Sequence, residues 1–150
     1  MIRRAAPADA DAVARVEAAA ADHPWTLDAV RGTLGSPAGF GLLAIDDGGA
    51  PIGHLIGSAA ADEGELLTLA VLPERRRLGV ASALHAAAVE VWRERGVTQA
   101  FLEVRDDNHG ARALYAALGW QPCGRRRAYY ADGTDAVLMR RAVAPGLTPP

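Results

Sequence analysis

The segment from Arg76 to Ala81 has the residue types of an anion-binding loop. It reads Arg-Arg-Leu-Gly-Val-Ala, and the apolar periodicity that follows predicts a helix beginning within it. Backbone N–H groups at a helix N-terminus, together with the helix dipole, favour a bound phosphate or pyrophosphate. Gly79 can adopt conformations that cost other residues energy, and the small Ala81 lets phosphate oxygens approach the main chain. An ordinary helix start with a solvated arginine cluster fits this short pattern equally well.

A carboxylate stands in the middle of an apolar strand. Glu103 lies within Ala-Phe-Leu-Glu-Val at positions 100–104, a run typical of strands that are covered on both faces. Burial of a carboxylate disfavours its charged form and makes it a better proton acceptor near neutral pH. We therefore expect Glu103 to be buried and to serve as a general base. A structural glutamate paired with Arg105 or with a backbone amide is the alternative.

A tyrosine twelve positions later could supply the acid. Tyr115 lies at helical spacing with Ala111, Leu114 and Leu118, so it faces inward from a helix that begins near Asn108. A phenol is protonated at pH 7 and could donate its proton to a departing thiolate. The alternatives are a core tyrosine with a satisfied hydroxyl, and an asparagine that only caps the helix.

Composition narrows the class of protein. The 150 residues are half hydrophobic and carry a net charge of −2, which predicts one domain over 1–143 without the basic excess that nucleic acid or an anionic membrane requires. No apolar run approaches the ~18 residues needed to span a bilayer, and no targeting peptide is indicated. Cys123 is the only cysteine, so we expect a reducing compartment, the cytoplasm.

Several kinds of chemistry are excluded or disfavoured. All 16 basic residues are arginine, so neither a lysine Schiff base nor a Walker-type lysine can form. Ser82 lacks a nearby histidine and aspartate pattern, which makes a hydrolase nucleophile improbable. The four histidines show no spacing that would place two metal ligands on one element, and we expect no metal. They are His23, His54, His85 and His109.

The elements that must position these residues form an α/β pattern with a mixed sheet. The N-terminal half predicts antiparallel strands, and strand, helix, strand order then implies a right-handed crossover and a parallel pair. A hairpin closes the fold. The expected strands are 2–5, 40–45, 52–59, 65–71, 99–104, 121–130 and 136–141, with a hairpin turn at Asp47-Gly48 and a loop over 32–41. The expected helices are 7–21, a short one from Thr26 or Asp28, 80–95 and 108–118, followed by a tail over 144–150.

These residues together resemble a known family. Arg76-x-x-Gly79-x-Ala81 after a strand resembles the coenzyme A loop of the GNAT superfamily of N-acetyltransferases. The run from Leu102 to Asn108 and the later aromatic positions look like the RimI group, which acetylates the N-terminal alanine of a small-subunit ribosomal protein. The resemblance covers nearly the whole chain and implies a GNAT fold. Its other segments are His23-Pro24-Trp25, 65–71, Ala111, Leu114-Tyr115, Leu118-Gly119-Trp120, Tyr129-Tyr130 and Asp135-Ala136.

The resemblance also implies roles for individual residues. Glu103 would accept the proton of the amine, directly or through water, Tyr115 would protonate the thiolate, and the Val71 N–H would polarise the thioester carbonyl. Acetyl-CoA would be the cosubstrate. Its implied contacts are Leu69, Ala70, Val71, Arg76, Arg77, Leu78, Gly79, Val80, Ala81, Ser82 and Asn108.

The acceptor is less well defined by the sequence. Trp25, Tyr129 and Tyr130 are the expected substrate-binding residues, and a protein N-terminus is the leading acceptor. A small-molecule amine or a lysine side chain is the rival, and a non-catalytic coenzyme A-binding sensor is a third reading that the presence of both Glu103 and Tyr115 disfavours. A monomer and a homodimer both remain open.

Two positions depart from the family pattern. Trp120 replaces a phenylalanine, which is a tolerable aromatic exchange, and the turn 131–134 is short where relatives border the peptide groove. We expect Arg125 to Arg127 to be a solvated strand edge, or more weakly a surface that steers an acidic or ribosomal partner.

Overall fold

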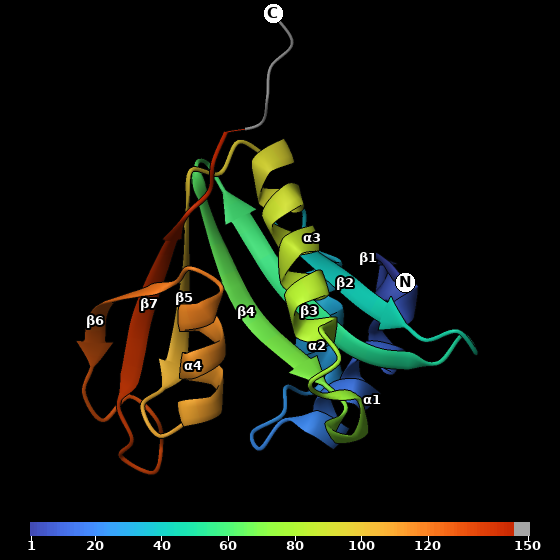
Figure 1. Cartoon of the computed structure of the whole chain (residues 1–150), viewed down its shortest axis with the longest axis horizontal. Helices are drawn as coiled ribbons and strands as arrows, with labels where there is room; N and C mark the ends of the chain where they lie inside the picture. Colours follow the sequence, from blue (N-terminus) through green and yellow to red (C-terminus); the bar gives the residue numbers. More distant parts are fainter. Residues whose placement is uncertain (146–150) are drawn as a thin grey trace, which may run out of the picture.

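The computed structural model describes residues 1–145, and it contains one seven-stranded sheet in the order β1-β2-β3-β4-β5-β7-β6 (Figure 1). All neighbouring pairs are antiparallel except β4 and β5, which are parallel. The predicted mixed sheet is therefore confirmed, and most of the predicted tail lies outside the described residues. The strands are β1 Ile2–Ala5, β2 Gly39–Ile45, β3 Pro51–Ala60, β4 Glu63–Val71, β5 Gln99–Arg105, β6 Gln121–Arg126 and β7 Ala136–Ala142.

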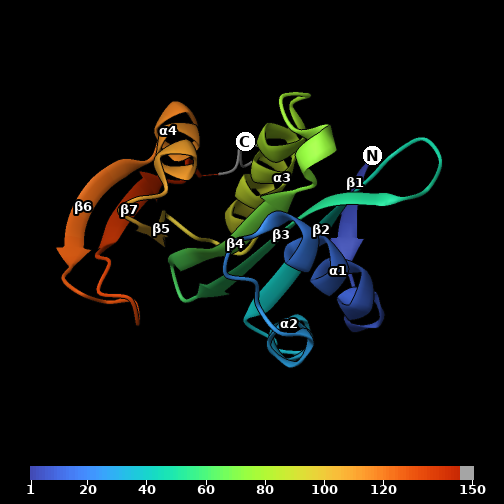
Figure 2. The same ribbon diagram turned by 90° about the horizontal axis from the view of Figure 1, so that it is seen from below.

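Helices cover the two faces of the sheet in pairs. One face carries α1 and α2, and the other carries α3 and α4 (Figure 2). Two short 3-10 turns, Pro7–Asp9 and Pro73–Arg75, precede α1 and the α3 loop. Within residues 1–145 no helix is long and apolar enough to cross a membrane. The helices are α1 Ala10–Ala20, α2 Leu27–Leu34, α3 Val80–Glu94 and α4 His109–Ala117.

The core divides along the same two faces. On the α3 face, Trp92 and Trp120 are almost completely buried, and their rings meet edge to face with centroids 6.2 Å apart. A smaller cluster on the α1 face contains Val13, Val30 and Ile56. Burying a large apolar side chain contributes roughly 1.5–3 kcal/mol, so these two clusters fix the helices to the sheet.

The sheet splits where β4 meets β5. Their parallel register covers only Glu63–Glu65 opposite Gln99–Phe101, and the two strands diverge beyond it (Figure 1). A register shift against β3 pairs Ile56 with Thr68 and Gly57 with Leu66, which leaves Leu67 as an extra residue in β4. Such a bulge bends its strand and increases its local twist. The bend carries the second half of β4 away from β5.

Two sequence expectations are wrong in detail. The loop predicted over 32–41 is shorter, because Gly32 lies inside α2 and β2 already begins at Gly39. The Thr26 side chain caps α2 by accepting the Ala29 N–H, and Val30 and Leu34 are buried. Capping and burial outweigh the ~1 kcal/mol cost of a glycine within a helix.

The strand predicted over 121–130 also ends early. Its last pair with β7 joins Arg126 and Ala136. Ala128 then takes a left-handed φ of 49°, and the Asp135 side chain accepts the Ala128 N–H at 2.8 Å. The chain therefore forms a loop rather than continuing the ladder. By contrast, the hairpin turn at Asp47-Gly48 is confirmed, with Asp46 accepting the Gly48 N–H.

The α3-side core contains a buried histidine. His85 Nε2 accepts the Trp120 indole N–H at 2.9 Å, and burial, with a smaller contribution from Arg141, lowers the pKa of His85 from 6.5 to about 4. The imidazole is therefore neutral in the folded protein at neutral pH, with its proton on Nδ1.

The neutral state of His85 predicts a pH-dependent stability. Between about pH 6.5 and about pH 4 the unfolded chain protonates this histidine while the folded chain does not, so the free energy of unfolding falls as the pH falls. His85→Gln keeps an acceptor for the indole and removes the titration. We expect it to flatten this part of the urea-unfolding profile by an amount on the order of 1–3 kcal/mol. An unchanged slope would show that other groups cause the loss.

Candidate active site

The second half of β4 turns backbone groups toward the split in the sheet. The Leu72 N–H donates to the Ile52 carbonyl of β3 at 2.9 Å. Because backbone groups of successive strand residues point in opposite directions, the N–H and C=O of Val71 face the open side, and those of Leu69 do the same. The Val71 carbonyl accepts from Arg76 Nε at 3.2 Å. The Val71 N–H is thus aimed at the space that β5 leaves.

The loop before α3 has the geometry of an anion site. Gly79 is the N-cap of α3, with a left-handed φ of 79° and no side-chain cap, and Arg77 also has a positive φ of 65°. Alternating backbone conformations of this kind turn successive N–H groups toward one point. The first N–H groups of the 15-residue α3, from Val80 to Ser82, therefore have no capping side chain to compete with an anion.

Arg76 holds this loop in place. Its Nε binds the Val71 carbonyl, and its Nη2 donates to the Ala20 carbonyl at the end of α1, 2.9 Å away. The side chain therefore joins β4, α1 and the loop. Arg76 is therefore a predicted cofactor-binding residue whose side chain is already hydrogen-bonded within the protein.

Tyr115 is buried on the inner face of α4, as its spacing predicted. It is 8 % exposed and its ring lies 6.2 Å, edge to face, from that of Trp120. Burial, and to a smaller extent the negative charge of Glu17, raises the pKa of Tyr115 to about 12. The phenol therefore carries its proton at neutral pH, as a general acid requires.

Glu103 is not buried, which corrects the expectation from its apolar strand. Leu102 and Val104 face the core, whereas the Glu103 side chain points to the opposite face and is 35 % exposed. The helices on that face pack on β2, β3 and β4 and leave β5 uncovered. Its carboxylate pairs with Arg126 at 3.1 Å, not with the suggested Arg105.

The segment after β6 places two tyrosines near this carboxylate. The rings of Tyr129 and Tyr130 lie 5.2 Å apart, and the guanidinium of Arg105 lies 4.7 Å from the ring of Tyr130. Burial, followed by the charge of Glu103, raises the pKa of Tyr130. Glu103 and Tyr130, both predicted site residues, therefore lie close enough for the charge of Glu103 to act on the Tyr130 hydroxyl.

The arginine cluster of β6 is only partly the solvated edge that the sequence suggested. Arg125 bridges Asp106 at 2.9 Å and Asp135 at 3.1 Å, and Arg126 lies over the Tyr129 ring, 5.7 Å from its centroid. These contacts tie the ends of β5 and β7 to β6. They hold the loop that carries the two tyrosines.

Asn108 caps α4. Its Oδ1 accepts the Ala111 N–H at 3.1 Å, so the capping role considered for it is confirmed. No residue within 1–145 accepts a hydrogen bond from its amide nitrogen. Its role as a cofactor contact stays a prediction.

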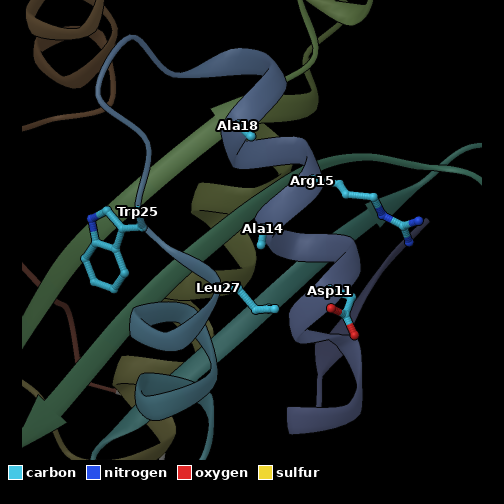
Figure 3. A pocket seen from close by; sticks show the side chains of 6 residues that line it. All are labelled: Asp11, Ala14, Arg15, Ala18, Trp25 and Leu27. Atoms are coloured by element: carbon cyan, nitrogen blue, oxygen red, sulfur yellow. The ribbon is translucent and has the colours of Figure 1, made fainter.

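Trp25 lies on the α1 side of the sheet. Its side chain borders a depression of about 680 Å³ over the outer face of α1 (Figure 3). Of the lining residues, only Trp25 was predicted as a site residue. The others are Asp11, Ala14, Arg15, Ala18 and Leu27.

One polar cluster escaped the sequence reasoning. Glu17 is 1 % exposed, and its carboxylate binds His54, Thr68 and the Trp25 N–H. Burial raises the pKa of Glu17, but these hydrogen bonds outweigh it and the net shift is downward. The sequence did contain a sign that Glu17 is buried, because position 17 lies four residues after the buried Val13 on the inner side of α1. Among residues 1–145 no group of three or more histidine, cysteine, aspartate or glutamate side chains could hold a metal.

The site's geometry agrees with comparisons to known proteins. The model of the acetyltransferase (GNAT) family matches residues 9–120. The ribosomal protein bS18-alanine N-acetyltransferase of Escherichia coli is 33% identical over 134 residues, which is 87% of this chain and 89% of that protein. The N-alpha-acetyltransferase RimI of Mycobacterium tuberculosis is 36% identical over 141 residues, covering 89% and 87%.

A solved structure supports the same relationship. The crystal structure of the ribosomal-protein-S18-alanine N-acetyltransferase from Escherichia coli superimposes with a TM-score of 0.85 at 28% identity, covering 98% of this chain and 97% of that one. The uncapped N-terminus of α3 and the open edge of β4 fit a pyrophosphate-bearing thioester, as this family uses. The chain belongs to the GNAT acetyltransferase family and is an acetyl-CoA-dependent N-acetyltransferase close to the RimI group.

Proposed function

We propose that this enzyme acetylates the N-terminal α-amino group of a protein that begins with alanine, with a small-subunit ribosomal protein as the first candidate. One observation carries the proposal. Tyr115 and Glu103 lie on opposite faces of the sheet, beside the split between β4 and β5. A thioester can enter from the α3 face while a chain terminus approaches from the face of Glu103. The two relatives described above are an N-alpha-acetyltransferase and a ribosomal protein alanine N-acetyltransferase, which supports an N-terminal acceptor. A ribosomal acceptor would place the reaction in the cytoplasm.

The cosubstrate is bound mainly by backbone groups in this proposal. The N–H groups at the start of α3 hold the pyrophosphate, with Arg77 adding positive charge, and the open edge of Leu69, Ala70 and Val71 pairs with the extended arm of the thioester. Asn108 contributes its amide from the start of α4. These contacts orient the acetyl group toward the split.

Acetyl transfer then needs a proton acceptor for the amine and a proton donor for the thiolate. Glu103 accepts a proton from the ammonium, directly or through water, and the free amine attacks the thioester carbonyl while the Val71 N–H stabilises the developing oxyanion. A carbon–nitrogen bond forms, the carbon–sulfur bond breaks, and Tyr115 delivers its proton to the departing thiolate. The nitrogen loses its extra proton as the amide forms, and this proton returns through water to the Tyr115 phenolate. The raised pKa of Tyr115 keeps that proton available at neutral pH.

The chemistry of Glu103 favours a chain terminus over lysine. An α-amino group has a pKa of about 7.7–8.0, whereas a lysine amine has a pKa of about 10.4. An exposed carboxylate paired with Arg126 is a modest base, so an amine that is already partly neutral suits it better. Trp25, Tyr129 and Tyr130 are the proposed contacts of the acceptor's first residues.

The cofactor loop can be tested by placing a negative charge at the helix start. Ser82→Glu puts a carboxylate in the first turn of α3, where it stabilises the helix by about 0.3–1 kcal/mol but repels a pyrophosphate. We expect an unchanged or higher melting temperature and at least tenfold weaker acetyl-CoA binding by calorimetry. Ser82→Gln is the neutral control. Equal affinities for the Glu and Gln variants would place the pyrophosphate elsewhere.

The two proton-transfer residues predict distinct losses. Tyr115→Phe keeps the packing against Trp120 and removes the acid, so kcat should fall by roughly 100-fold with acetyl-CoA binding unchanged. Glu103→Gln should lower kcat by a similar factor at neutral pH. The rate of thiol release from acetyl-CoA measures kcat for both variants. Comparable turnover by Glu103→Gln and the parent, with binding intact, would remove Glu103 from the mechanism.

The acceptor is tested with peptides that differ only in their first residues. Thiol release should be fastest with an N-terminal alanine, and at least tenfold slower with the same peptide blocked at its N-terminus and carrying an internal lysine. Small amines form the third arm. Transfer to lysine or to small amines in preference to alanyl peptides would assign the enzyme to the rival acceptor class.

A further inference from the structure

A buried polar cluster between α1 and the sheet has no part in the mechanism above. Glu17 projects from α1 and is 1 % exposed, and its main side-chain partner, His54 of β3, is 0 % exposed. Charged side chains are rarely buried so completely unless several hydrogen bonds compensate for their desolvation. The cluster lies between α1 and the bulged part of β4, because Glu17 binds Thr68 next to the bulge at Leu67.

Three donors from three different segments meet at the Glu17 carboxylate. Oε1 accepts from Thr68 Oγ1 of β4 at 2.9 Å and lies 2.9 Å from His54 Nε2, while Oε2 accepts the Trp25 backbone N–H at 3.1 Å. His54 Nδ1 is buried without a partner among the described residues. Because an ionised carboxylate only accepts hydrogen bonds, His54 donates its Nε2–H to Glu17.

The Thr68 arm of the cluster holds the bulge of β4. Leu67 packs in the α1-side cluster and Thr68 binds Glu17 on that same face, whereas Leu66 and Leu69 pack in the α3-side cluster. Two consecutive residues on one face are the mark of the extra residue in the strand. Glu17 therefore fastens β4 next to Leu69, where the proposed acetyl-binding edge begins.

The Trp25 arm holds the other side of the site. The chain between α1 and α2 carries the proposed acceptor contact Trp25, and its backbone N–H is fixed by the second oxygen of the same carboxylate. The negative charge of Glu17 also contributes to the raised pKa of Tyr115, which shows that the carboxylate lies within electrostatic reach of the reacting groups.

We propose that Glu17 is a positioning residue for acetyl transfer, whose carboxylate sets the spacing between the acceptor-side segment at Trp25 and the acetyl-side bulge of β4 at Thr68. The inference rests on the proposed function for the assignment of these two sides. A misplacement of the amine by about 1 Å can reduce the rate by a factor of about 100, so a small shift of either arm is enough to be measured.

Substitutions at the two ends of the cluster test this role. Thr68→Val keeps the shape and removes one hydrogen bond, and Glu17→Gln replaces one acceptor oxygen by an NH₂ group that faces a donor. Each should lower kcat/KM for an alanyl peptide by about tenfold or more. The dissociation constant of acetyl-CoA should stay within about threefold, because the loop before α3 that is proposed to hold the pyrophosphate is untouched. Thr68→Ser restores the hydroxyl and should restore kcat/KM.

A matched control separates positioning from general destabilisation. Leu34→Ala removes buried apolar surface where the end of α2 packs on Gly41 of β2, a strand that β3 separates from β4. It should lower the melting temperature at least as much as Thr68→Val while leaving kcat/KM within about twofold of the parent.

The outcomes are distinct. Parental kcat/KM in Thr68→Val, or a loss that Thr68→Ser does not restore or that Leu34→Ala reproduces, would overturn the positioning role. If Glu17→Gln does not fold, the Thr68 pair alone decides. If the parent transfers acetyl only to another amine, the proposed acceptor is wrong, and the same variants are compared on that amine to decide the role of Glu17.

Discussion

The short pairing of β4 with β5 is the constraint on which the rest of the molecule depends. Only Glu63–Glu65 pair with Gln99–Phe101, and the bulge at Leu67 carries the remainder of β4 away. A continuous ladder would have consumed the Val71 N–H and closed the sheet. Instead the Val71 N–H faces the split, where a ligand can satisfy it, and the Val71 carbonyl accepts from Arg76. The proposed cofactor edge, the loop before α3 and the proposed acid Tyr115 all border this split.

Electrostatics differ on the two sides of the split. On the α3 face, burial raises the pKa of Tyr115 and lowers the pKa of His85, so both side chains are neutral at pH 7. On the other face, charges remain exposed and paired, as in Glu103 with Arg126. Burial disfavours whichever form of a group is charged. One sheet can therefore hold a proton donor on one side and a charged acceptor on the other without the two neutralising each other.

Most of the fold could be predicted from local patterns. Helical spacing located α3 and α4, and Tyr115 lies on the inner face as predicted. The errors lie where a tertiary contact overrides a local signal. Gly32 reads as a loop residue but is held in α2 by the burial of Val30 and Leu34, and β6 ends at Arg126 because Asp135 captures the backbone of Ala128.

The sequence by itself determined the helix start at Gly79, the inward face of Tyr115 and the order of the elements, because each depends on residues close together in the chain. Only the tertiary structure decided that Glu103 is exposed, since this depends on which helices cover β5, and neither α1 nor α2 does. It also decided that Glu17, His54 and Thr68 form one cluster. His54 lies 37 positions and Thr68 lies 51 positions after Glu17 along the chain, and no periodicity relates the three residues. Their meeting is set by the register of β3 with β4 and by the packing of α1 against both strands.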